Sequence, residues 1–148
     1  MNHWLVTLHL ALVGLWLGCV LTEALFERAL LGKGRDKELI LTALHKRVDV
    51  FIEIPAFTLV VVTGLLLMPS APMGLVFVAK LVFALLAVAA NVFCVHLVFK
   101  RHQWAATGDW TGFEATDHLQ HKWGAVVLIG ILGALIAGVV SGHFTSQA

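Results

Sequence analysis

Three side chains that can bind metals or protons recur every fourth residue in the stretch HKRVDVFIEIP, residues 45–55. His45, Asp49 and Glu53 therefore share one face of a helix. Imidazole nitrogens and carboxylate oxygens are ligands for zinc, iron and manganese, and both groups also carry protons. The spacing predicts a helix face that can hold a metal ion or relay protons.

This face adjoins apolar sequence, and the chain as a whole has the composition of a membrane protein. Of its 148 residues, 59% are hydrophobic and only 13% are charged. So little charge does not suit a soluble domain of this length. The net charge of +1, without a basic run interleaved with aromatics, gives no sign of nucleic-acid binding. We therefore expect an all-α integral membrane protein whose main partner is the lipid bilayer.

Four apolar stretches are long enough to span a membrane, since about 20 helical residues cross roughly 30 Å of hydrocarbon. We place these spans, within a single domain 1–148, at about 4–26, 46–68, 77–99 and 122–143. The uncharged run 54–68 reaches only about 22 Å, so the second span must also include Glu53 and Asp49. The third span likewise brings Lys80 or His96 toward the hydrocarbon boundary.

Lysine and arginine are distributed unevenly between the two sides of these spans. Nine of the ten lie on the side of loops 28–40 and 100–121, and only Lys80 lies toward the other side. By the positive-inside rule both loops face the cytoplasm and both termini face outward. We expect a four-helix bundle in a bacterial inner membrane. Thr116 is expected to be the N-cap of the fourth helix.

Polar residues from all four spans fall in the cytoplasmic half of the bilayer when depth is counted from each span's midpoint. Glu53 and Asn91 lie roughly 5 Å from the centre, and His45 and His121 roughly 16 Å from it. His118 and His121 are three residues apart, so both imidazoles can reach one metal ion. The candidate metal ligands are Glu23, His45, Asp49, Glu53, His96, His118 and His121.

Carboxylates inside a bilayer need a neutralising partner. An ionised Asp at the centre of a span costs about 2.5–3.5 kcal/mol on insertion scales. Four-helix bundles that bind metals use Glu and His side chains that point inward from facing helices. The pattern is therefore compatible with an iron, zinc or manganese site, with a salt-bridged or proton-conducting cluster, and with ordinary interfacial residues.

Two further polar residues lie in the outer half. Lys80 has no acidic residue on its own side, so it either snorkels to the interface or contacts an anionic ligand. His9 and Trp16 are seven residues apart and share a face. His9 is expected to contact a cofactor or substrate, or to form a hydrogen bond between helices. His143, at the outer end of the fourth span, could meet His9.

Small residues recur every fourth position in the fourth span, at Gly130, Ala134, Gly138 and Gly142. Small side chains in this register allow two helices to approach closely. The stripe predicts close packing within the bundle or, alternatively, a homodimer formed through Gly130, Ala134 and Gly138.

Three stretches also resemble one family. HLALVGLW, residues 9–16, followed by LGCV, resembles the first helix of the copper-resistance protein D superfamily, which includes the small membrane protoporphyrinogen oxidase of the haem pathway. AKLVFALLAVAANVF is similar to a span there in which a lysine precedes a histidine by about three turns, and Asn91 stands at that second position here. VDVFIEIPAF resembles an Asn-Glu-x-Pro segment of the oxidase, with Glu53 and Pro55 matching.

The resemblance implies a helical membrane bundle that binds haem b. The residues expected at that cofactor are His9, Trp16, Lys80, Asn91 and His143. We therefore predict a metal-cofactor protein, with haem b first and iron, zinc or manganese second. It would act in electron transfer or oxidoreduction with a quinone or another small hydrophobic substrate. The alternatives are a metal-handling or transport protein and a structural subunit of a larger membrane complex.

Overall fold

The computed structural model describes residues 3–71 and 73–145, and it confirms the all-α prediction. The helices are α1 His3–Leu30, α2 Arg35–Val48, α3 Ile54–Leu67, α4 Leu75–Thr107 and α5 Trp110–Thr145. A π-helical turn, Asp49–Glu53, joins α2 to α3, and a short 3₁₀ turn, Met68–Ser70, follows α3. No strand occurs in the described residues.

Four of these helical stretches are long and apolar enough to cross a membrane. Because the π-helical turn keeps the chain helical, α2 and α3 form one continuous stretch, Arg35–Leu67, of 33 residues. The other three are α1, α4 and α5. This agrees with the four predicted spans, and the apolar helices indicate an integral membrane protein.

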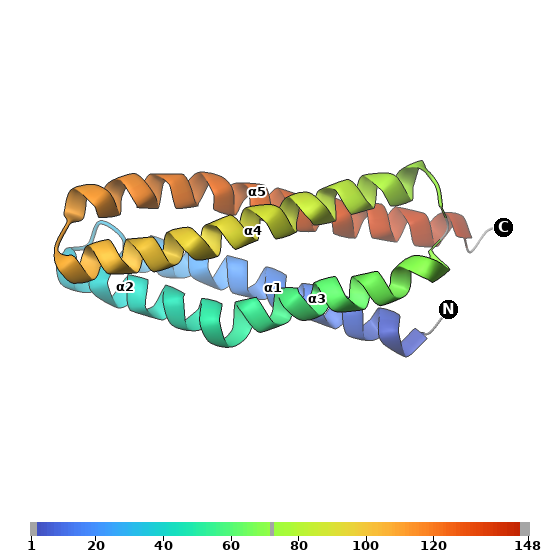
Figure 1. The fold of residues 1–148 in the computed structure, drawn as a ribbon, viewed down its shortest axis with the longest axis horizontal. Coiled ribbons are helices and arrows are strands. Elements are labelled where there is room, and N and C mark those ends of the chain that lie inside the picture. The colour runs from blue at the N-terminus through green and yellow to red at the C-terminus, as the bar shows by residue number, and fades with distance from the viewer. Residues whose placement is uncertain (1–2, 72, 146–148) are drawn as a thin grey trace.

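The helices lie side by side along one axis (Figure 1). The α1–α2 and α4–α5 turns lie together at one end of the bundle, which we call the turn end. The start of α1, the end of α5 and the α3–α4 connection lie together at the opposite end. Helix α1 therefore begins, and helix α5 ends, at the same end of the bundle.

The predicted loops 28–40 and 100–121 are wrong, because most of both segments is helical. In place of loop 28–40, α1 continues to Leu30 and α2 begins at Arg35. In place of loop 100–121, only Gly108 and Asp109 separate α4 from α5. Gly108 ends α4 with a left-handed φ of 75°, which glycine adopts readily. Charged residues mark where a helix leaves hydrocarbon, and that helix can extend well beyond this point.

The start of the fourth spanning helix also differs from its prediction. Thr116 is no N-cap, because it lies within α5 and its hydroxyl donates to the Gly112 carbonyl at 2.8 Å. The Asp109 carboxylate instead accepts a hydrogen bond from the Gly112 backbone N–H at 2.9 Å, as an N-cap does. Helix α5 therefore begins about two turns earlier than the sequence suggested.

Small residues of α5 let it pack closely on α4. A Cβ atom placed on Gly130 would lie 2.8 Å from the Cβ of Ala87, and one on Gly133 would lie 2.5 Å from the Phe83 ring. Gly138 lies beside the Lys80 side chain of α4. The Gly130 and Gly138 positions are thus used inside the bundle, and the homodimer stays a prediction.

Candidate functional site

A cavity of about 250 Å³ lies inside the bundle, lined by residues of α1, α2, the π-helical turn, α4 and α5. Its polar lining residues are Glu23, Glu27, His45, Asp49, Glu53, Asn91, Gln120 and His121. Its remaining walls are apolar, with Val20, Val95 and Leu128 among them. Six residues singled out from the sequence therefore converge on one space: Glu23, His45, Asp49, Glu53, Asn91 and His121.

The π-helical turn carries two of the carboxyl groups that line this cavity, those of Asp49 and Glu53. Asp49 and Glu53 begin and end it and are 2% and 3% exposed. Pro55 has no backbone N–H and cannot continue the α-helical pattern. The N–H of Ile54 instead donates to the carbonyl of Asp49, five residues earlier. Single π-turns within helices often occur at functional sites.

Three side chains at the cavity, which we call the inner cluster, are close enough to bind one metal ion. Glu23, His45 and Asp49 each offer a ligand atom, and these atoms all lie within 4.8 Å of one another. The Nε2 atom of His45 lies 2.8 Å from Glu23 Oε2. Glu53 lines the same cavity one helical turn beyond Asp49.

The inner cluster and its neighbours leave buried polar atoms without partners. These atoms are Glu23 Oε1, Asp49 Oδ2, Glu53 Oε2, Asn91 Nδ2 and Gln120 Oε1, none of which has a hydrogen-bond partner among the described residues. Buried polar atoms are nearly always satisfied in folded proteins. Five unsatisfied atoms around one cavity therefore point to missing partners: a proton, a water molecule or a cation for the oxygens, and an acceptor such as water for Asn91 Nδ2.

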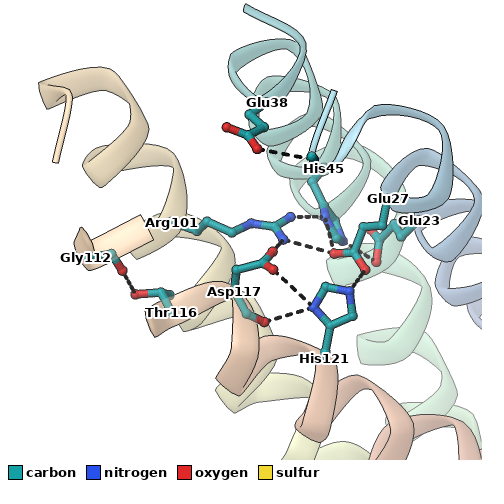
Figure 2. A network of polar contacts seen from close by, with 10 residues as sticks. Glu23, Glu27, Glu38, His45, Arg101, Gly112, Thr116, Asp117 and His121 are labelled. Atoms are coloured by element: carbon teal, nitrogen blue, oxygen red, sulfur yellow. Dashed lines mark hydrogen bonds and ion pairs between the residues drawn. The ribbon is translucent and has the colours of Figure 1, made fainter. Parts of the chain in front are cut away.

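A second group lies on the turn-end side of the cavity, and we call it the outer cluster (Figure 2). It consists of Glu27 from α1, Arg101 from α4, and Asp117 and His121 from α5. The Arg101 guanidinium donates to Glu27 Oε1 at 3.0 Å and to the Asp117 carboxylate. His121 Nε2 lies 2.9 Å from Glu27 Oε2.

The outer cluster is balanced in charge. His121 donates from Nδ1 to the Asp117 backbone carbonyl at 2.9 Å and from Nε2 to the Glu27 carboxylate, so both ring nitrogens carry a proton. Two carboxylates are then matched by the guanidinium of Arg101 and the imidazolium of His121. This cluster is satisfied without any ligand.

The contact between the clusters fixes the tautomer of His45. Arg101 Nη2 lies 2.6 Å from His45 Nδ1 (Figure 2). A guanidinium only donates hydrogen bonds, so Nδ1 must accept and carries no proton. The single ring proton is then on Nε2, where it is donated to Glu23 Oε2. His45 is neutral and contributes no positive charge to the inner cluster.

The inner cluster, unlike the outer cluster, has no positively charged side chain to balance its carboxyl groups. Around the inner part of the cavity stand three carboxyl groups, from Glu23, Asp49 and Glu53, with a neutral histidine. No lysine or arginine is among the described residues that line this cavity. Bringing three carboxylates together in a low-dielectric space is unfavourable unless positive charge or protons enter with them.

Two predicted metal ligands, His96 and His118, lie away from this cavity. His96 is exposed on α4, where its ring stacks on Phe93 with centroids 6.5 Å apart, and it lines a separate groove. His118 is exposed on α5. His118 precedes His121 by three residues, which is about 60° short of a full helical turn. This offset places the His118 side chain outside the bundle interior.

The residues expected at a haem are only partly brought together. Trp16 Nε1 donates to Asn91 Oδ1 at 3.3 Å, which links Trp16 to the cavity wall. His9 Nδ1 pairs with Thr63 Oγ1 at 2.7 Å, so His9 takes part in a hydrogen bond between helices. Neither His9 nor Lys80 is among the described residues that line this cavity or the groove beside His96. The side chain of His143 lies outside the described residues.

Sequence reasoning missed four residues of the site: Glu27, Arg101, Asp117 and Gln120. The signal was present, because Glu27 follows Glu23 by four residues and Asp117 precedes His121 by four. Arg101 was missed because the residues around it were predicted to form a loop. Asp117 was placed only in the first turn of the fourth helix, and its spacing to His121 was not considered.

Comparison of the chain with protein-family models, with curated proteins and with solved structures finds no match. The resemblance to the copper-resistance protein D superfamily therefore stays a prediction. Proposals about function rest on the cavity and its two clusters.

Proposed function

We propose that this chain is a membrane-embedded metal-binding protein whose site is the inner cluster together with Glu53. The observation that carries the proposal is the set of three carboxyl groups around one cavity, each with a buried oxygen that lacks a partner. A divalent cation would satisfy these oxygens and neutralise their charge together. Protons alone would neutralise the charge without using the imidazole that lies within ligand distance.

The ligand chemistry favours iron, manganese or zinc. Carboxylate oxygens are hard ligands, and an imidazole nitrogen suits zinc and iron. Glu23, Asp49 and Glu53 would bind first, because His45 Nε2 carries a proton in the metal-free state. His45 can bind through Nε2 only when that proton leaves, and Nδ1 then gains a proton as Arg101 moves off it. We propose the carboxylates as the primary ligands.

The identity of the metal would decide the role of the protein. Iron or manganese would allow electron transfer or oxidoreduction with a quinone or another small hydrophobic substrate, which is the role we propose. Exchangeable zinc would instead fit metal handling. We also propose that the inner cluster lies in the cytoplasmic half of a bacterial inner membrane, because nine of ten lysines and arginines lie toward the turn end.

Metal analysis of the purified protein tests the proposal. We expect about one metal ion per chain after exposure to Fe²⁺, Mn²⁺ or Zn²⁺, and its loss in the Asp49→Asn/Glu53→Gln double variant. Glu38→Gln is the matched control, since Glu38 is also a buried carboxylate but pairs with Arg35 outside the cavity.

Two results would contradict the proposal. One is a wild-type protein that takes up none of the three metals, and the other is a double variant that binds them as well as the control does. A visible spectrum is recorded on the same samples. A Soret band that survives the double variant would assign the cofactor to haem b in place of the inner cluster.

A further inference from the structure

A second hollow lies on the outer face of the bundle, between α2 and α4. Lys46, His96, Phe99, Lys100, His102 and Gln103 line this groove of about 520 Å³. It lies on the opposite side of α2 from the cavity of the inner cluster, because His45 is 3% exposed and faces inward while the next residue, Lys46, faces the groove. We call it the basic groove.

The basic groove concentrates positive charge without compensation. It holds two lysines and two histidines, and no acidic residue is among its described lining residues. Neither Lys46 nor Lys100 forms an ion pair in the described part of the chain, whereas Arg35 and Arg101 both do. Lysines held near each other repel, so the groove is electrostatically suited to an anion.

Packing directs one of these charges onto the neighbouring helix. Lys46 Nζ lies 5.3 Å from the centre of the Phe99 ring, so this side chain of α2 lies over α4. His102 Nδ1 lies 3.3 Å from Thr42 Oγ1, which leaves Nε2 as the nitrogen free for a ligand. Donors from α2 and α4 therefore surround one space.

Below the charges, the same outer faces are apolar. Val50 of the π-helical turn and Phe93 and Phe99 of α4 are 39%, 37% and 40% exposed. Charged groups above an exposed apolar surface, at the point where a span leaves hydrocarbon, match the form of a phospholipid. The phosphate would meet the lysines and the acyl chains would run along the apolar faces.

We propose that the basic groove binds the phosphate of an anionic phospholipid headgroup. The recognition is by charge and by N–H donors, from the lysine ammonium groups, the Gln103 amide and the imidazoles. The proposal does not depend on the metal site, because none of these side chains lines the inner cavity.

Native mass spectrometry of the detergent-solubilised protein tests this site. Phosphatidylglycerol is titrated against wild-type protein and against the Lys46→Gln/Lys100→Gln double variant. We expect the double variant to bind it about 30-fold more weakly, from the loss of two lysines at a membrane surface. Lys33→Gln/Lys37→Gln removes the same charge from exposed positions at the α1–α2 turn, and its affinity should stay within about twofold of wild type.

Two further arms identify the source of the phosphate. Phosphatidylcholine should bind weakly, and millimolar inorganic phosphate should not displace phosphatidylglycerol, if the lipid is recognised as a whole. Displacement by inorganic phosphate would instead assign the groove to a soluble phosphate compound. Equal lipid binding by wild type and the groove variant, or equal loss in both double variants, would overturn the proposal. Size-exclusion elution as a single peak verifies that each variant is folded.

Discussion

Arg101 is the residue that joins the two clusters of the site. Its side chain is completely buried, and its guanidinium contacts Glu27, Asp117 and His45. A buried charge of this kind is tolerated because its partners compensate it. The same contacts hold His45 in the tautomer that donates to Glu23, so Arg101 acts on the inner cluster without reaching the cavity.

Removal of Arg101 should destabilise the bundle. Arg101→Met leaves the buried carboxylate of Asp117 and the partly buried carboxylate of Glu27 with only His121 to balance them. We expect the free energy of unfolding to fall by about 3–5 kcal/mol, measured by denaturation in mixed detergent micelles. Arg28→Met is the control, because Arg28 is exposed and forms no ion pair among the described residues. Equal stability of the two variants would contradict the role given to Arg101.

Replacement of Glu53, in contrast to that of Arg101, should increase the stability of the metal-free protein while abolishing metal binding. Glu53→Leu removes a carboxyl group that has a buried, unpartnered oxygen. We expect the metal-free variant to be more stable than the metal-free wild type by about 1–4 kcal/mol, and to lose its metal. Unfolding is measured with and without chelator. A Leu variant that still loads fully would exclude Glu53 as a ligand.

At the scale of elements, the π-helical turn decides what the second spanning helix presents to the cavity. It adds one residue to a turn between two α-helical halves. His45 lies before it and Glu53 lies at its end, yet both line the same cavity. The residues between Asp49 and Glu53 face outward, and Phe51 is 77% exposed.

Deletion of Phe51 should convert the π-helical turn into an ordinary α-helical turn, because the π-turn holds one residue more than an α-helical turn does. Seven residues would then separate His45 from Glu53, which is within about 20° of two full turns, so both side chains would still face the cavity. We expect helix content in circular dichroism and metal binding to be kept, and loss of metal binding in this variant would contradict the role given to the turn. Phe51→Ala, which shortens an exposed side chain without changing the register, should bind metal as the wild type does.

The elements were predictable to different degrees, for physical reasons. Hydropathy located all four long helices, because apolar length is what a bilayer requires. It could not show where the helices end, because the polar extensions beyond hydrocarbon keep helical hydrogen bonding. Asp49 and Glu53 were found by length and spacing. Arg101 was not, since its partners lie 74 and 16 residues away along the chain.

At the scale of the molecule, the topology fixes which parts lie together. The beginning of α1 and the end of α5 share one end of the bundle (Figure 1). The outer cluster lies toward the turn end, because its residues are close to the end of α1, the end of α4 and the start of α5. Of the four long helices, α4 and α5 pair most extensively, through small residues such as Gly130. The clusters therefore lie between this pair and the pair formed by α1 with α2 and α3.

Reporter fusions test the orientation that we propose for this arrangement. Alkaline phosphatase, which is active only outside the cytoplasm, should be active when fused after Ala148 and inactive when inserted at Gly108–Asp109. Green fluorescent protein at the same two positions should give the reverse pattern. Activity of phosphatase at the α4–α5 turn would place the clusters in the opposite leaflet.

The shortness of that turn has a consequence for how the protein is made. Only Gly108 and Asp109 separate α4 from α5, and Arg101 forms an ion pair with Asp117 across them. During synthesis Arg101 emerges after Glu27 and His45 but before Asp117. Its charge is fully compensated only once α5 has followed. We therefore expect α4 and α5 to enter the bilayer as a helical hairpin, and a chain that stops before Trp110 to insert α4 poorly.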